Sequence, residues 1–219
     1  MNAWFALVPR LVDGWMLTLR LLAVSIPLGL AVGVAVGVAR VYGPRPVRVA
    51  AAVYQSVLRG IPLVVQLFLL YYVLPRAGLL LSPFAAAAAG FALCSGAYHS
   101  EYIRSAISSI PFGQMEAARA LGMSHFLAIR TIILPQTARR ALPGCGNELV
   151  YLVKYSSLAY LVTLVDLMGA GRIEASASFR FFETFLVVGM LYLLMVAIVR
   201  AGLHLLQRYW RRSTAGVSG

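Results

Sequence analysis

Five apolar stretches, each about as long as a bilayer core is thick, constrain the fold of this chain more than any other feature of its sequence. A helix needs about 20 predominantly apolar residues to cross that core, because every backbone N–H and C=O must be paired inside the segment. The stretches run over residues 17–38, 58–74, 83–98, 149–168 and 185–206. We therefore expect an all-α integral membrane protein with five transmembrane helices.

The composition excludes a soluble globule and argues against nucleic acid as a partner. With 61% hydrophobic and 12% charged residues among 219, the chain has too few polar side chains to cover a water-facing surface. The net charge of +12 comes from basic residues at the ends of apolar stretches, not on one face. The lipid bilayer is therefore the expected partner. Cys94 and Cys145 provide neither a disulfide framework nor a metal-ligand spacing, and we assign neither a role.

The positions of the arginines predict the orientation, because Lys and Arg accumulate on the cytoplasmic side of short loops. The first stretch is too long for a signal-peptide core and is read as a retained span. If the chain crosses the bilayer five times, three regions lie on one side: the one after the first stretch, the one between the third and fourth stretches, and the C-terminal one. Their arginines are Arg40, Arg45, Arg48, Arg104, Arg119, Arg130, Arg139, Arg140, Arg200, Arg208, Arg211 and Arg212. The other side has Arg10, Arg76, Arg172 and Arg180, partly offset by Asp13, Glu174 and Glu183. We expect the N-terminus outside and the C-terminus in the cytoplasm.

The interval 100–146 is too polar to span a membrane yet rich in helix formers, and this orientation places it in the cytoplasm. Its prolines and glycines predict a helix over 114–121, a turn at Gly122, a helix over 124–133 and a new helix opening at Pro135. Glycine accepts the positive φ of such a turn, and proline suits a first helical turn. The residues that divide the interval are Pro111, Gly113, Gly122, Pro135 and Pro143.

The helix over 114–121 has the shape of an inserting element. Ala117, Ala118 and Ala120 keep it slim, so that it and the tight turn after it fit a groove on a separate subunit. Glu116 near its start is favourably placed against the helix dipole. The alternative is an ordinary helical hairpin in which Glu116 is only a capping charge.

The spacing of this interval resembles the coupling motif of ATP-binding-cassette (ABC) importer permeases. Glu116-Ala117-Ala118 is followed after three residues by Gly122, and after nine more by Ile132, with Leu134-Pro135 completing the pattern. Further segments of the sequence resemble the polar amino-acid branch of these permeases, which includes histidine, glutamine and arginine importers. They are Glu101-Tyr102-Ile103-Arg104, Gly113-Gln114, Pro135-Gln136, and Arg59-Gly60-Ile61-Pro62 with Gln66.

The resemblance implies a single permease domain over residues 1–219, with interval 100–146 as its cytoplasmic coupling part. It implies that Glu116, Ala117, Ala118, Gly122, Leu134 and Pro135 couple the permease to an ATPase. The implied assembly has two permease subunits, identical or paralogous, two ATPase subunits that bind ATP and Mg, and an extracytoplasmic solute-binding protein. The implied cargo is a polar amino acid or related compound, carried across a bacterial inner membrane. The chain itself is expected to bind no cofactor or metal and to be no enzyme.

Three polar side chains near membrane depth are candidates for a substrate path, because polar and ionisable groups there are costly and often functional. They are Arg59, Gln66 and Lys154. Arg59 and Lys154 could instead extend to the headgroups, and Gln66 could only link helices. Gly60 and Pro62 interrupt the start of the second stretch, which favours this stretch as a lining of the path.

The chain departs from the family pattern after Lys154. The family commonly has Lys-Asp-Thr-Ser here, whereas this chain has Lys154-Tyr155-Ser156-Ser157, so a carboxylate function cannot be carried over. How Lys154 is paired stays open. Asp166 matches an acid often found near the outer end of the fourth stretch, although an interfacial acid facing water is an equal alternative.

Glycines in the first and third stretches predict close helix packing. They include Gly29, Gly33 and Gly37, then Gly90 and Gly96 among alanines. Because one five-helix unit leaves little room for a solute, we expect a pore made by two subunits.

Two functional classes are alternatives to an ABC permease, namely an ion-coupled secondary transporter and a membrane enzyme. An ion-coupled secondary transporter typically has repeated halves and acids at mid-membrane, whereas we place Glu101, Glu116 and Glu148 in the cytoplasmic interval. A membrane enzyme is disfavoured because the three histidines are scattered and no glycine-rich phosphate loop is present. ATP binding must therefore come from another polypeptide.

Overall fold

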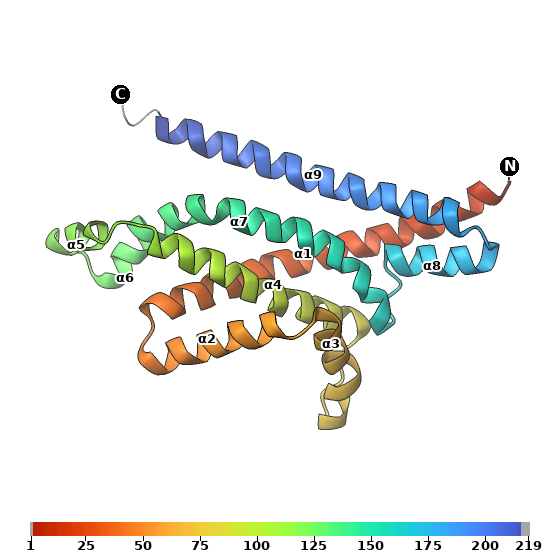
Figure 1. Cartoon of the computed structure of the whole chain (residues 1–219), viewed down its shortest axis with the longest axis horizontal. Helices are drawn as coiled ribbons and strands as arrows, with labels where there is room; N and C mark the ends of the chain where they lie inside the picture. The colour runs from red at the N-terminus through yellow and green to blue at the C-terminus, as the bar shows by residue number, and fades with distance from the viewer. Residues whose placement is uncertain (1, 216–219) are drawn as a thin grey trace.

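Helices make up the whole fold in the computed structural model, which describes the backbone of residues 2–215 and the side chains of residues 9–210. The first helix, α1 (Asn2–Tyr42), begins at one end of the long axis, and the last helix, α9 (Phe181–Ala215), ends at the other (Figure 1). Between them lie α2 (Arg45–Gly60), α3 (Leu63–Phe68), α4 (Pro83–Ser108), α5 (Gly113–Ala120), α6 (His125–Ala128), α7 (Leu134–Tyr155) and α8 (Leu167–Ser178). Four short turns of other helix types complete the fold: η1 (Leu69–Val73), η2 (Leu74–Ala77), η3 (Ile129–Ile133) and η4 (Ser156–Val162).

The centre of the molecule is the pair α1 and α4, which lie side by side along much of their length. Small residues allow this approach: a Cβ at Gly33 would collide with the Cβ of His99, and one at Gly29 would collide with Ser95 Oγ. Larger side chains at these glycines would force the two backbones apart. The close packing predicted from the glycines is therefore present.

Two of the described helices, Pro9–Tyr42 and Phe181–Trp210, are long and apolar enough to cross a bilayer alone. Two bent helix pairs pass the same test as broken spans, which gives up to four. α4 covers the predicted third span but is not among them, and many of its side chains lie buried inside the bundle. The number five and the orientation stay predictions. The side chains of Arg211 and Arg212, which were counted for the orientation, lie outside the described residues.

The second predicted span, 58–74, is not one helix. α2 ends at Gly60, the chain is extended at Ile61 and Pro62, and α3 starts in a direction that bends the pair by 105°. Pro62 causes this break because its ring disfavours a helical conformation at the residue before it. The interruption predicted from Gly60 and Pro62 is present. The bend of 105° is larger than we expected for a stretch predicted to form one span.

The predicted fourth span, 149–168, is likewise not one regular helix. α7 ends at Tyr155 and passes into η4, and a bend of 57° separates this unit from α8. Ser156 and Ser157 donate their hydroxyls to the carbonyls of Val153 and Lys154, both at 2.7 Å, and such bonds compete with regular helix.

Asp166 begins α8 and is fully buried, so it is not a water-facing interfacial acid. Its Oδ1 accepts the N–H of Gly169 at 3.0 Å, and Tyr192 donates its hydroxyl to Oδ2 at 3.3 Å. These contacts are those of a helix N-cap tied to α9.

The interval predicted to be a set of short helices is shorter than 100–146. α4 continues to Ser108, and α7 starts at Leu134 and runs through Pro143 without a break. Pro135 lies in the first turn of α7, as predicted, although the wide turn η3 leads into this helix with helical backbone at Ile133 and Leu134. A π-type turn changes the hydrogen-bond register and so tolerates a following proline that lacks an N–H. Only residues 109–133 leave the long helices.

Candidate functional site

Residues 109–133, named here the coupling segment, lie at the end of the molecule where α9 ends (Figure 1). α5 starts one residue before the predicted helix and ends one residue earlier than predicted. Glu116 lies in its first turn and is exposed, while Met115 and Ala118 are buried against the rest of the protein. Ala117 is exposed beside Glu116, so residues 115–118 have both an outward and an inward face.

A left-handed turn follows α5 and needs glycine. Gly122 has φ +80°, and a Cβ placed there would contact nothing within 4 Å. Backbone conformation, not lack of space, therefore selects glycine. Ser124 then caps α6 by accepting the N–H of Leu127 at 3.2 Å, so the turn is closed on both sides.

Three large apolar side chains of the coupling segment face outward. Phe112, Leu121 and Phe126 are 77%, 83% and 73% exposed. Exposed apolar patches on a polar segment are typical of surfaces that another protein covers. The sequence analysis did not identify these three residues as exposed. The sequence offered one indication: none of them belongs to an apolar helix face that neighbouring helices could bury.

A groove of about 950 Å³ lies beside the same patch, between the end of α1 and α5. Tyr42 and His125 meet edge to face across it, with ring centroids 5.4 Å apart. Glu116 and Arg119 also line the groove, so it combines apolar walls with charges of both signs.

An apolar cluster connects the inner side of the coupling segment to the long helices. Ile129 and Ile133 of η3 pack there with Met115 and Ala118. The cluster continues into α4 and α7 through Ile103, Ala106, Ile107, Ala141 and Cys145. Arg140 of α7 also donates to the carbonyl of Ser109 at 2.6 Å and to its hydroxyl at 3.0 Å. Displacement of α5 is therefore opposed by contacts to both α4 and α7.

The last two residues of the predicted coupling set lie beyond the segment itself. Leu134 is half-buried and packs against this cluster, and Pro135 is exposed in the first turn of α7. The structure therefore brings Ala118 and Leu134 to the inner side, and leaves Glu116, Ala117, Gly122 and Pro135 at the surface.

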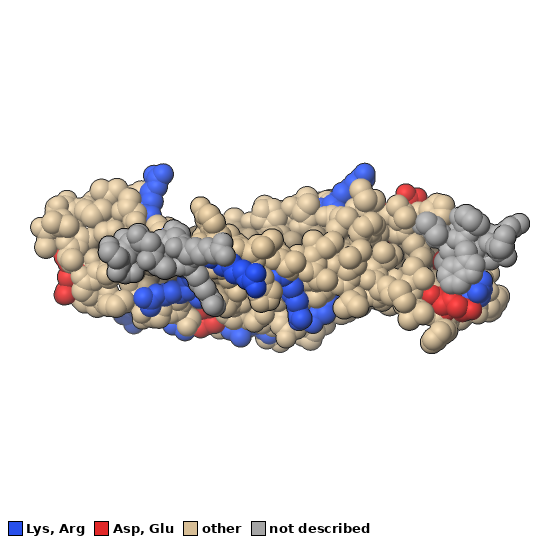
Figure 2. All heavy atoms as spheres, turned by 90° about the horizontal axis from the view of Figure 1, so that it is seen from above, with Lys and Arg blue, Asp and Glu red and all other residues tan. Residues whose placement is uncertain are grey.

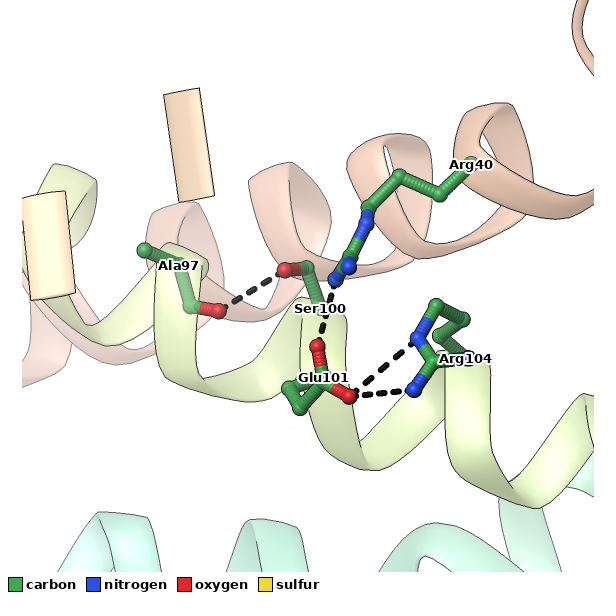
Figure 3. Close-up of polar contacts among 5 residues, drawn as sticks. All are labelled: Arg40, Ala97, Ser100, Glu101 and Arg104. Atoms are coloured by element: carbon green, nitrogen blue, oxygen red, sulfur yellow. Dashed lines mark hydrogen bonds and ion pairs between the residues drawn. The ribbon is translucent and has the colours of Figure 1, made fainter. Parts of the chain in front are cut away.

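An ion-pair triad joins α1 to α4 (Figure 3). Arg104 donates to Glu101 Oε1 at 2.5 and 3.2 Å, and Arg40 of α1 donates to Oε2 at 2.6 Å. These bonds, first that from Arg104 and then that from Arg40, lower the pKa of the Glu101 carboxyl to about 2. Glu101 and Arg104 were noted in the sequence only as part of a family resemblance; the bond to Arg40 could not be anticipated.

Two of the three candidate path residues lie at the break between α2 and α3. Gln66 donates to the carbonyls of Leu58 at 2.7 Å and Ile61 at 2.8 Å, and so pairs groups that the break leaves free. This contact supports the helix-linking alternative for Gln66. The guanidinium of Arg59 lies over the ring of Tyr98, 4.9 Å from its centroid.

Lys154 is exposed on α7, and its ammonium lies 4.3 Å from the centroid of the Tyr151 ring. Tyr151 in turn stacks on Tyr155, the residue that replaces the acid of the family pattern, at 6.0 Å. Lys154 is therefore paired with an aromatic face, a cation–π contact, and forms no ion pair with a described acid.

Glu148 does not belong to the water-exposed interval, because α7 has already completed several turns when it reaches this residue. Its side chain is buried, with only 4% exposed. Among the described residues, no group of three or more His, Cys, Asp or Glu could hold a metal ion.

The comparisons with known proteins agree on one family. A family model described as "Binding-protein-dependent transport system inner membrane component" matches residues 25–212. The nopaline transport system permease protein NocM of Agrobacterium fabrum is 39% identical over 212 residues, covering 92% of this chain and 88% of the relative. A probable amino-acid ABC transporter permease protein, YckA of Bacillus subtilis, is 36% identical over 200 residues, covering 91% and 88%.

Solved structures share the fold. The crystal structure of an amino acid ABC transporter with histidines matches with a TM-score of 0.83 and 33% identity, covering 92% of this chain and 94% of the transporter chain. An inward-facing structure of the MetNI methionine ABC transporter matches with a TM-score of 0.78 at 21% identity, covering 91% and 95%, which shows the fold alone. This chain therefore belongs to the binding-protein-dependent transport system inner membrane components, in their polar amino-acid ABC permease branch.

Proposed function

We propose that this chain is the membrane subunit of an ATP-driven importer, and that its coupling segment receives force from a separate ATPase. The observation that carries the proposal is the exposed apolar surface of the coupling segment, formed by Phe112, Leu121 and Phe126, while the segment is otherwise anchored to the long helices. A second subunit seated on this patch would remove three large apolar side chains from water.

In this mechanism, ATP binding draws two ATPase subunits together and moves α5 with them. The push passes from Met115 and Ala118 to α4, and through η3 to α7, because a close-packed cluster transmits displacement without compressing. The helices of two permease subunits then turn from an inward-open to an outward-open arrangement.

The proposed cargo is a polar amino acid or a related compound, delivered by an extracytoplasmic binding protein. The names of the relatives, which include amino-acid and nopaline permeases, support this substrate class. The 105° break at Ile61 and Pro62 supports a path beside α2 and α3, since irregular backbone at membrane depth is tolerated where it is buried or faces a cavity. Arg59 and Lys154 are the proposed solute-facing groups, and Gln66 holds the break in shape.

Replacement of Gly122 by valine tests this function in proteoliposomes that contain the complete transporter. A β-branched residue held at φ +80° costs about 1–3 kcal/mol, so the turn should change shape. We expect solute uptake to fall about tenfold or more while ATP hydrolysis by the complex persists. Gly202→Val is the control, because Gly202 lies on the exposed face of α9 with nothing within 4 Å of its Cβ position. Undiminished uptake by Gly122→Val would count against the mechanism.

A further inference from the structure

A polar pocket of about 250 Å³ lies between α7 and α9, outside the coupling segment and the proposed path. α9 contributes Arg200, His204 and Gln207 to its wall, and α7 contributes Asn147. The three α9 residues have the i, i+4, i+7 spacing that places side chains on one face of a helix. Four side chains that can donate hydrogen bonds therefore converge on one space.

The two helices touch beside this pocket, which fixes its shape. Gly146 of α7 faces Leu203 of α9 so closely that a Cβ on the glycine would lie 3.0 Å from the nearest methyl carbon. Val150 adds a buried apolar wall. At about 30 Å³ for each water molecule, the volume corresponds to roughly eight waters, which is enough for a phosphodiester group.

The pocket is basic, and no described acid lines it. Glu148, the acid of α7, is only 4% exposed and lies away from the pocket, and Glu183 of α9 pairs with Arg180 near the other end of that helix. Arg200 forms no ion pair with a described acid. Figure 2 shows basic side chains gathered on this face toward the C-terminal end of α9, with few acidic ones among them.

The pocket also lies at the level expected for lipid headgroups. The apolar stretch 185–206 of α9 ends within it. From there toward the middle of α9, the surface is apolar and exposed, with Ile198 at 60% and Leu193 at 69%. A ligand that fits this arrangement has an anionic head and an apolar tail.

We propose that this pocket binds the phosphate of an anionic phospholipid. Arg200 donates to the phosphate oxygens, for which a guanidinium fork is well suited. His204, Gln207 and Asn147 complete the donor set, and an acyl chain runs along the exposed apolar side chains of α9. The lipid thereby bridges α7 and α9 near the end of the molecule that carries the coupling segment. This site does not depend on the proposed ATP coupling.

The test uses the purified complete transporter in neutral detergent. Native mass spectrometry counts bound phosphatidylglycerol, and the thermal midpoint is measured with phosphatidylglycerol, phosphatidylcholine or inorganic phosphate added. Arg200→Gln is compared with Arg208→Gln, which makes the same charge change on an exposed residue of the same helix that does not line the pocket. We expect phosphatidylglycerol affinity to fall about fivefold or more for Arg200→Gln only, and Arg200→Lys to recover part of it.

Several results would overturn the proposal. Equal losses for Arg200→Gln and Arg208→Gln would show general charge attraction instead of a site, and equal binding of phosphatidylcholine would show no preference for an anion. Stabilisation by inorganic phosphate as large as that by phosphatidylglycerol would make the ligand a free anion. Absence of bound phosphatidylglycerol in the complete transporter would show that the pocket does not hold this lipid. If Arg200→Gln does not fold, His204→Leu serves as the second variant, and unchanged lipid affinity in it would equally contradict the proposal.

Discussion

Glu101 accepts hydrogen bonds from arginines on two different helices, and its contribution to the stability of the fold therefore depends on pH. Its carboxyl has a pKa of about 2, lowered by Arg104 and Arg40 from an ordinary value of 4.5. A carboxyl whose pKa is lower in the folded state stabilises the fold above its unfolded pKa. That contribution is lost as the pH falls from about 4.5 toward 2.

We therefore expect the thermal midpoint of the wild-type protein in detergent to decrease between pH 5 and pH 3 more steeply than that of Glu101→Gln. The size of the difference is modest, because the triad is partly solvent-exposed and water screens it. Circular dichroism melts at a series of pH values measure both slopes. Parallel slopes would show that the triad contributes nothing to acid stability.

Lys154 offers a prediction about the solute path. Its exposed ammonium lies over the face of Tyr151 and forms no ion pair with a described acid, so a passing carboxylate can compete for it. Lys154→Ala should raise the apparent KM for uptake about fivefold to tenfold, which corresponds to roughly 1–1.4 kcal/mol, with little change in the amount of assembled complex. Lys154→Arg, which keeps the charge, is the control. Identical uptake kinetics for Lys154→Ala and wild type would remove this residue from the path.

Whole helices show where prediction from the sequence succeeds and where it stops. The helix of α5, the turn at Gly122 and the break at Pro62 follow from local rules about glycine, proline and helix formers, and they are present. The breaks after Tyr155 and the continuity through Pro143 do not follow, because hydrogen bonds of serine hydroxyls and packing by neighbouring helices decide them. Hydropathy alone cannot separate a straight span from a bent one.

The candidate site divides in the same way. The spacing from Glu116 to Pro135 identifies the segment, since a motif is a local property. Which of its side chains point outward depends on how the segment rests on α4 and α7, so the exposed side chains of Phe112, Leu121 and Phe126 became visible only in three dimensions.

The apolar patch of the coupling segment leads to a prediction about assembly. Leu121→Ala combined with Phe126→Ala removes apolar area that a bound ATPase would cover, and should weaken ATPase binding about tenfold or more. Phe182→Ala is a matched control, because Phe182 is 78% exposed and lies at the start of α9, far along the molecule from the coupling segment. Binding of the purified ATPase to immobilised permease measures the difference. Equal binding by the double variant and the control would exclude this patch as the docking surface.

The molecule as a whole is arranged so that the coupling segment lies at one end and the first turns of α1 and α9 lie at the other (Figure 1). The arginine distribution predicts which end is cytoplasmic. The proposed function requires the coupling segment to be on the side where ATP is available.

Sided labelling of Leu121→Cys tests this requirement most directly. The variant is made in a background without Cys94 and Cys145, and membrane vesicles of both orientations are treated with a membrane-impermeant maleimide, with and without added ATPase subunit. We predict labelling only in inverted vesicles, where the cytoplasmic face is outward, and protection by the ATPase. Labelling in right-side-out vesicles, or labelling that the ATPase does not reduce, would contradict a cytoplasmic coupling segment driven by a separate ATPase.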